Sequence, residues 1–196
     1  MSVLAVNGGN PVRKKPYPVW PAARNNEYDH LLQILDSPDW GILNDEVERL
    51  AKTYADYTGA KYALPVSNGT IALEVILRAL HIGRGDEVIV PIYTFVASVS
   101  AIVAVGATPV FADVEYSTHL LDSRSVECNL TPKTKAILAV HIGGRPCDMD
   151  SLLQLGKKYN IPVIEDSAQA HGAQWKDKKA GTMGIAGSFS FQASKN

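Results

Sequence analysis

Short apolar runs alternate with segments of helical pattern from Lys61 to the end of the chain, and this alternation leaves few folds open. Most of the runs are rich in β-branched and apolar residues, which is typical of strands that are covered on both faces. Strands separated by helices favour a mostly parallel sheet with helices on both sides, which is the α/β class. We expect strands at 62–66, 87–90, 108–111, 136–140, 163–166 and 188–191, and helices at 70–81, 95–105, 124–129 and 150–159.

The beginning of the chain has a different pattern. Residues 1–26 contain several prolines and a short basic run, which predicts an extended arm and not a core element. We expect a short helix at 27–36, and a second helix that is capped by Asn44 and stops at Gly59. The predicted organisation is an arm of residues 1–26 followed by one domain of residues 27–196.

Composition excludes several classes of partner. With 196 residues, 46% of them hydrophobic, the chain is long enough for one α/β domain with a full core. The formal net charge of −1 gives no electrostatic reason to expect nucleic acid or a membrane surface. Cys128 and Cys147 lack metal-ligand and redox spacing, so we expect buried or idle thiols, no metal site and a reducing cytoplasm. We see neither a signal peptide nor a membrane-spanning run of about 18 apolar residues.

The last stretch of the chain contains an acid and an amine that suggest chemistry. The apolar run before Asp166 predicts a buried strand that presents this carboxylate at its carboxyl end. Lys195 follows the expected strand at 188–191 after a short step. Together they would suit pyridoxal phosphate (PLP), whose aldehyde bonds a lysine and whose pyridine nitrogen is kept protonated by a carboxylate. Taken singly, Asp166 could cap the next segment and Lys195 could be an ordinary surface lysine.

The turn Ser67-Asn-Gly-Thr70 lies between the first expected strand and an apolar helix. Free N–H groups at a helix N-terminus, with the helix dipole behind them, bind an anion such as phosphate. The alternative is that a polar side chain of the turn only caps the helix. Because the turn matches neither GxGxxG nor GxxxxGK[ST], a Rossmann-type nucleotide enzyme is disfavoured.

Other side chains follow the ends of expected strands. Phe95 could stack on a planar cofactor ring, although an aromatic residue here is more often part of the core. Gln169 has donors for a phenolic oxygen, and the Ser190 hydroxyl could reach a phosphate oxygen. We favour structural hydrogen bonding for His141 and His171 over a contact with substrate. All four loops concerned leave the carboxyl ends of strands, where ligands bind in open α/β sheets: 67–70, 94–95, 166–169 and 190–195.

Several longer motifs occur in a specific order: Asn68-Gly-Thr-Ile-Ala-Leu73, Gly85-Asp-Glu-Val-Ile-Val-Pro91 with Thr94-Phe95, Gly106-Ala-Thr-Pro-Val-Phe-Ala-Asp113, Thr131-Pro-Lys-Thr-Lys-Ala136, Val140-His141, Glu165-Asp-Ser-Ala-Gln169 and Ser188-Phe-Ser-Phe191 through Lys195-Asn196. In this order and spacing, the chain from about Trp40 onward resembles the DegT/DnrJ/EryC1/StrS family. These are fold-type I PLP enzymes, mostly aminotransferases that act on keto sugars.

The resemblance implies a role for each matching residue. Lys195 would be the Schiff-base lysine that also moves the proton, and Asp166 would be the partner of the pyridine nitrogen. Phe95 would stack on the ring, and Gln169 would approach its phenolic oxygen. The phosphate would be held by Gly69, Thr70 and Ser190.

The resemblance also implies substrates and partners. Glutamate or glutamine would donate the amino group, and the acceptor would be a keto sugar linked to a nucleotide, or a keto-cyclitol, since Ala170-His-Gly-Ala-Gln-Trp175 is also similar to members that act on such rings or on amino-hydroxybenzoate precursors. A homodimer is implied because family members place their active sites at a subunit interface. Family members continue well past the lysine, with one further sheet strand and a small C-terminal domain, so we expect residues 1–196 to be a fragment that is inactive alone.

Two alternatives stay open. A regulatory relative could bind PLP or a sugar nucleotide without turnover. A PLP-dependent sugar dehydratase of the same family would carry histidine at the lysine position, and Lys195 argues against it.

Overall fold

The computed structural model describes residues 3–17, 19–22, 25–38 and 45–195. The chain divides into two units, Met1–Trp40 and Gly41–Asn196. In the first unit, a 3₁₀ turn at Ala5–Asn7 precedes the helix α1 (Asn25–Asp36). This helix confirms the one expected at 27–36 and begins two residues earlier. The division into an arm of residues 1–26 and a single domain stays a prediction.

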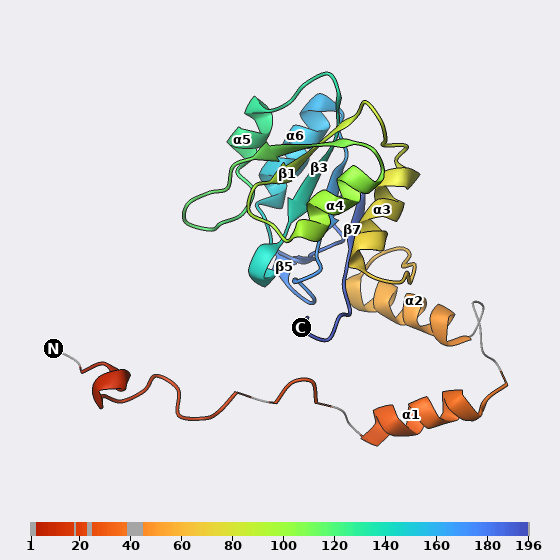
Figure 1. The fold of residues 1–196 in the computed structure, drawn as a ribbon, viewed down its shortest axis with the longest axis vertical. Helices are drawn as coiled ribbons and strands as arrows, with labels where there is room; N and C mark the ends of the chain where they lie inside the picture. Colours follow the sequence, from red (N-terminus) through yellow and green to blue (C-terminus); the bar gives the residue numbers. More distant parts are fainter. Residues whose placement is uncertain (1–2, 18, 23–24, 39–44, 196) are drawn as a thin grey trace. The chain divides into compact units, whose positions relative to one another are not determined.

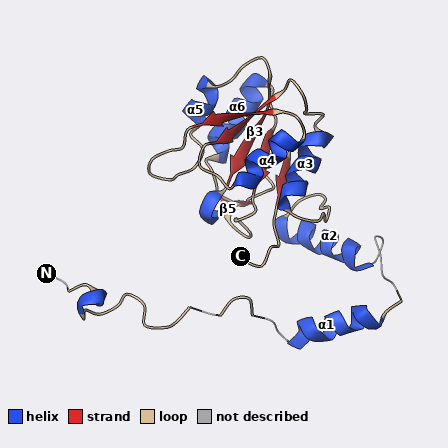
Figure 2. Ribbon diagram, viewed as in Figure 1, coloured by secondary structure: helices blue, strands red, loops and turns tan. Residues whose placement is uncertain are grey.

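The second unit is built on a five-stranded parallel sheet with the order β2-β1-β3-β4-β7 (Figure 1). The mostly parallel sheet expected from the sequence is therefore confirmed, and Figure 2 shows its strands as one group of arrows enclosed by helices. The strands are β1 (Glu87–Pro91), β2 (Thr108–Ala112), β3 (Thr134–Val140), β4 (Val163–Asp166) and β7 (Ala186–Ser188).

Helices cover both faces of this sheet, as the lack of polar alternation predicted. One core lies under α3 (Gly69–Ala79) and α4 (Val96–Ala104), and it contains Ile164 of β4. The other lies under α5 (Ser123–Cys128) and α6 (Met149–Tyr159), and it contains Val163. Because successive residues of a strand point to opposite faces, these neighbours in sequence belong to different cores.

The helix α2 (Asp45–Thr58) precedes the sheet, and it ends where the sequence predicted. Gly59 follows it with φ of 82°, a left-handed conformation that glycine adopts without steric cost. The predicted cap Asn44 lies outside the described residues.

Two expected strands are wrong in position or kind. Residues 62–66 run without regular secondary structure, and the side chains of Tyr62 and Leu64 are 78% and 75% exposed. A strand is defined by its hydrogen-bonded neighbour, and no described segment pairs with 62–66. The last strand is Ala186–Ser188 and not 188–191, because the aromatic residues beyond Ser188 pack on α2 and leave the ladder. The hairpin of β5 (Gln174–Trp175) and β6 (Lys178–Lys179) was not predicted.

Candidate functional site

The carboxyl end of β4 presents two adjacent acids to opposite faces of the sheet. Glu165 and Asp166 are 0% and 7% exposed, so neither carboxylate is a surface charge. Asp166 shares the face of Ile164, toward α4, whereas Glu165 shares the face of Val163, toward α6. Buried carboxylates need partners, and each of these two acids has its own set.

Asp166 is held by groups from α4 and from its own loop. The hydroxyl of the fully buried Ser98 donates to Oδ2 of Asp166 at 2.7 Å, and the N–H of Ala168 donates to Oδ1 at 3.2 Å. Thr94 Oγ1 lies 2.8 Å from Ser98 Oγ. Since the Ser98 proton points to the carboxylate, Thr94 must be the donor in the second contact. These hydrogen bonds fix the position of the carboxylate at the carboxyl end of β4.

The turn before α3 joins the last strand region at a close contact. Asn68 caps the helix, because its Oδ1 accepts the N–H of Ile71 at 3.0 Å. Phosphate binding at this turn stays a prediction. A Cβ added to Gly69 would lie 3.1 Å from the Ser190 Cβ and 3.3 Å from the Phe189 carbonyl oxygen. Capping by Asn68 leaves the first helical N–H groups, those of Gly69 and Thr70, without an intrahelical acceptor. The structure therefore brings Gly69 and Ser190 together beside a helix N-terminus.

The remaining predicted residues lie in the loops at the same edge of the sheet. Lys195 Nζ lies 5.4 Å from the centre of the Phe95 ring, and Phe95 is the residue that precedes α4. The Phe95 side chain is 59% exposed, so it is not part of the core in this unit. The side-chain oxygen of Gln169 accepts the N–H of Gly143 at 2.8 Å, which ties the loop after β4 to the loop after β3. The structure thus brings together Lys195 and Phe95, which lie 100 positions apart in the sequence.

Glu165 is the centre of a buried network that the sequence did not predict. Its carboxylate accepts hydrogen bonds from the N–H groups of Gly181, Met183 and Gly184 at 2.7, 2.6 and 2.6 Å. It also accepts one from Nε2 of the fully buried His141 at 2.9 Å. Burial acts to raise the pKa of Glu165, but these hydrogen bonds outweigh it and hold the pKa below its ordinary value.

His141 has a structural role in this network, as predicted. The N–H of Cys147 donates to its Nδ1 at 3.1 Å, so Nδ1 carries no proton and Nε2 is the donor to Glu165. Burial raises the pKa of the Cys147 thiol to about 12, which makes it an unreactive thiol. The other cysteine, Cys128, is exposed and also free.

The substitution Glu165→Gln tests the structural importance of this network. We expect the free energy of unfolding at pH 7 to fall by about 1–3 kcal/mol, because one oxygen that accepts backbone N–H groups is replaced by a donor. A lowered pKa means that the carboxylate stabilises the fold above its unfolded-state pKa and loses this contribution as the pH falls through its folded-state pKa. The difference in unfolding free energy between wild type and variant should therefore be largest at pH 7. It should become smaller as the pH falls below about 4.3, the ordinary pKa of Glu.

Chemical denaturation at pH 7 and at pH 4 measures both effects. Glu48→Gln is the matched control, since Glu48 is an exposed residue of α2, and we expect it to change the unfolding free energy by less than about 0.5 kcal/mol. An equal loss of stability in both variants would contradict the proposed role of Glu165.

The comparison with known families identifies the family of the chain. A family model described as the DegT/DnrJ/EryC1/StrS aminotransferase family matches residues 21–196. The chain belongs to the DegT/DnrJ/EryC1/StrS aminotransferase family. The resemblance inferred from the sequence motifs is thereby confirmed for most of the chain.

Members of the DegT/DnrJ/EryC1/StrS family with assigned reactions are among the relatives. The L-glutamine:2-deoxy-scyllo-inosose aminotransferase of Streptomyces kanamyceticus is 44% identical over 200 residues, which cover 99% of this chain and 47% of the relative. The dTDP-3-amino-3,6-dideoxy-alpha-D-galactopyranose transaminase of Aneurinibacillus thermoaerophilus is 48% identical over 159 residues, which cover 81% of this chain and 44% of the relative. The chain spans about half the length of the curated relatives it matches.

Solved structures of the family have the same fold. A sugar aminotransferase structure from Streptococcus pneumoniae, in its PLP-form, matches with a TM-score of 0.82 and 35% identity, covering 90% of this chain and 48% of that chain. The same protein has also been solved in a PMP-form. These likenesses confirm the fold class predicted from the sequence.

Two further observations concern the part of the chain that the structure describes. None of its helices is long and apolar enough to cross a membrane. In the same residues, no three side chains of His, Cys, Asp or Glu are grouped so that they could hold a metal ion.

Proposed function

We propose that this chain is the cofactor-binding part of a PLP-dependent aminotransferase that aminates a keto-cyclitol or a keto sugar. The observation that carries this proposal is the buried Asp166 carboxylate, which Ser98 and Ala168 hold at the same sheet edge where the Gly69–Ser190 contact forms. A buried anion held in this way is suited to pair with a protonated ring nitrogen. Family membership supports the same chemistry.

Several features of this edge are compatible with the phosphate and the ring of PLP. A Cβ at residue 69 would meet Ser190, so glycine keeps open the place where a phosphate would approach the helix N-terminus. Gly69, Thr70 and Ser190 would hold the phosphate, Phe95 would lie on the ring, and Gln169 would approach its phenolic oxygen. The hydroxyls of Ser167 and Ser188, both buried, have no hydrogen-bond partner among the described residues. Ser188 is in register with Asp166 on the neighbouring strand, so its side chain shares the face of the sheet that Asp166 occupies.

PLP would supply an electron sink that makes the carbon–hydrogen bond of the amino donor acidic. Lys195 would hold the cofactor covalently through Nζ and, once displaced by the donor, would use the same nitrogen to take and return a proton. Asp166 would keep its negative charge beside the ring nitrogen throughout, and Ser98 with Thr94 would keep its oxygen in place. In this proposal the protein would contribute a fixed charge at Asp166 and a mobile base at Lys195.

The relatives support a choice of substrates for the whole protein. Because the names of several relatives combine L-glutamine with a scyllo-inosose, we infer glutamine, or glutamate, as the amino donor and a keto-cyclitol as the acceptor. A nucleotide-linked keto sugar is the second candidate, supported by the dTDP-sugar transaminase at 48% identity. The proposal includes a homodimer and a cytoplasmic location, which follow from the family resemblance and from the cysteine usage.

The dehydratase alternative has one specific observation in its favour. A GDP-4-keto-6-deoxymannose-3-dehydratase, solved with bound GDP-perosamine, is a structural neighbour with 29% identity and a TM-score of 0.84. Lys195 in this chain supplies the amine that an aminotransferase needs, so we favour transamination.

The proposal predicts a covalent complex between PLP and Lys195. Full-length protein mixed with PLP should develop an absorbance band in the visible range, and borohydride should bleach it by fixing the cofactor to the protein. Mass analysis of the proteolysed product should then find the added mass on Lys195. Addition of glutamine or glutamate before borohydride should remove the band, and a panel of keto-cyclitols and nucleotide-linked keto sugars should restore it selectively.

Two results would contradict the proposal at different levels. If no bleachable band forms, or if the added mass lies on another lysine, the PLP enzyme assignment fails. If the band forms but no donor removes it, the protein binds PLP without transamination, as the regulatory alternative requires.

A further inference from the structure

Residues of α2 and of the loop after β4 meet the segment that leads to Lys195. The Tyr54 ring of α2 packs edge to face against Phe189 and Phe191, with ring centres 5.1 and 5.0 Å apart. The His171 ring packs against the same two phenylalanines at 5.3 and 5.1 Å. The two rings therefore lie on the stretch that follows β7, where the chain has left the sheet.

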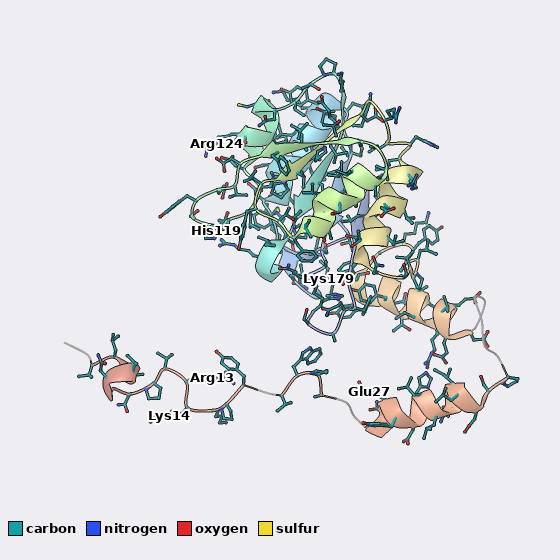
Figure 3. All side chains as sticks on the ribbon, in the orientation of Figure 1. Arg13, Lys14, Glu27, His119, Arg124 and Lys179 are labelled. Carbon is teal, nitrogen blue, oxygen red and sulfur yellow. The ribbon has the colours of Figure 1, made fainter. Side chains whose placement is uncertain are left out.

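The helix α2 is fixed to the same region by a second contact. Lys179 of β6, labelled in Figure 3, lies with its Nζ 3.8 Å from the centre of the Tyr57 ring, one turn after Tyr54. A cation over an aromatic face at this distance is attractive. The contact between Lys179 and Tyr57 therefore helps to hold α2 in place, and with it the Tyr54 ring.

A hydrogen-bonded chain connects Tyr54 to the backbone of Ser190 through His171. Nε2 of His171 lies 2.9 Å from the carbonyl oxygen of Ser190, and its Nδ1 lies 2.7 Å from the Tyr54 hydroxyl. A carbonyl oxygen only accepts, so Nε2 must carry a proton. In a neutral imidazole with its proton on Nε2, Nδ1 is an acceptor, so the Tyr54 hydroxyl donates to it. Burial, with a smaller contribution from Tyr57, raises the pKa of the Tyr54 phenol, which agrees with this donor role. Both ring nitrogens of His171 are thus assigned, and the tautomer is fixed by its two partners.

The carbonyl that His171 binds belongs to a residue of the candidate site. Ser190 is the residue whose Cβ limits the space at Gly69, beside the N-terminus of α3. After Ser190, hydrogen bonds of the chain run within the segment itself, from Gln192 N–H to Ser190 Oγ at 3.5 Å and from Lys195 N–H to the Gln192 carbonyl at 2.8 Å. A shift of the Ser190 backbone would therefore be passed on to Lys195.

We propose that His171, oriented by Tyr54, is a positioning residue that holds Ser190 in place to bind the cofactor phosphate. This inference rests on the proposed function, and it adds two residues that would touch neither the cofactor nor the substrate. Their hydrogen bonds, and not only the volume of their rings, set the position of Ser190. The pair links α2 to the phosphate side of the site.

Substitutions that keep the rings but remove the hydrogen bonds test this proposal. His171→Phe and Tyr54→Phe keep an aromatic ring in the cluster, and His171→Gln keeps a side-chain N–H that can reach the Ser190 carbonyl. The measurement is the dissociation constant of the full-length apoprotein for PLP and for pyridoxal, which lacks the phosphate. The dissociation constant for pyridoxal divided by that for PLP reports on the contribution of the phosphate.

We expect this ratio to fall by roughly 3–10-fold in His171→Phe, the range that corresponds to one hydrogen bond. Tyr54→Phe should lower it in the same direction, and His171→Gln should restore it toward wild type. Tyr62→Phe is the control, because it removes the same hydroxyl at an exposed position outside the aromatic cluster, and we expect its ratio to be unchanged. Melting temperatures of the apoproteins separate a loss of fold from a loss of positioning.

An unchanged ratio in both His171→Phe and Tyr54→Phe would overturn the inference, and so would a ratio in His171→Gln as low as in His171→Phe. If His171→Phe does not fold, Tyr54→Phe alone decides, because it removes a single oxygen. These outcomes are distinct from a failure of the proposed function, in which wild-type protein would form no borohydride-sensitive complex with PLP at all.

Discussion

Replacing Lys195 with alanine should reduce transamination by the full-length protein by at least roughly 10²–10⁴-fold, the range that a positioned proton-transfer group contributes. The variant loses the nitrogen that would hold PLP covalently and also the base that would move the proton. Because Phe95 and the phosphate-side residues remain, PLP should still bind, but without the borohydride-sensitive absorbance band. Steady-state turnover with glutamine and a keto-cyclitol, together with absorbance spectra, measures both effects.

Lys157→Ala provides the control for this prediction. Lys157 is an exposed residue of the last turn of α6, and its removal should leave turnover and the spectrum unchanged. A soluble amine added to the Lys195→Ala protein should restore part of the turnover if the missing function is that of a base. Retention of the absorbance band in Lys195→Ala would show that another lysine carries the cofactor.

Replacing Asp166 with asparagine should lower turnover by roughly 10²–10³-fold, the range measured when one preorganised electrostatic group is removed. Asparagine has nearly the same shape, and its side-chain oxygen can still accept the hydrogen bond from Ser98. What the variant loses is the negative charge that would keep the ring nitrogen protonated. The cofactor should therefore still bind to Lys195 and give the absorbance band, while turnover collapses.

The combination of a retained band and lost turnover is specific to this role. Asp177→Asn, at an exposed position in the turn between β5 and β6, is the matched control and should leave turnover unchanged. Turnover near the wild-type level in Asp166→Asn would show that a different carboxylate serves the ring nitrogen. A variant that no longer folds would be recognised by its melting temperature, because Asp166 is buried.

Much of the fold could be predicted from the sequence because local patterns decide it. The strands β1, β2 and β3 and the helices α3, α4 and α6 lie where their apolar runs predict them, and each has a covered face in one of the two cores. Residues 62–66 have an equally apolar pattern but form no strand, because a strand also needs a hydrogen-bonded neighbour. The alternation at 188–191 predicts a strand wrongly for a related reason, since its aromatic residues pack on Tyr54 and not on a sheet face.

The candidate site could be predicted only for residues next to apolar runs. Asp166 ends an apolar run, so its place at one edge of the sheet follows from topology. No strand precedes the turn at Gly69 in the described part of the chain, so its prediction came from the apolar helix that follows it. Ser98 and Tyr54 lie inside helices, and their contacts depend on which helix packs where. The buried network around Glu165 depends on backbone N–H groups of a loop, and no sequence pattern indicates where such groups point. The one available signal was the adjacent pair of acids at the end of an apolar run.

The adjacent acids Glu165 and Asp166 make β4 sensitive to changes in its length. Since Glu165 serves the scaffold and Asp166 serves the proposed chemistry, a slip of β4 by a single residue would exchange their surroundings and leave each acid with the wrong neighbours. We therefore expect insertions or deletions within β4 to be tolerated far less than conservative replacements of its apolar residues. Directed evolution of this protein toward new acceptors would do best to leave the length of this strand alone and vary the surrounding loops.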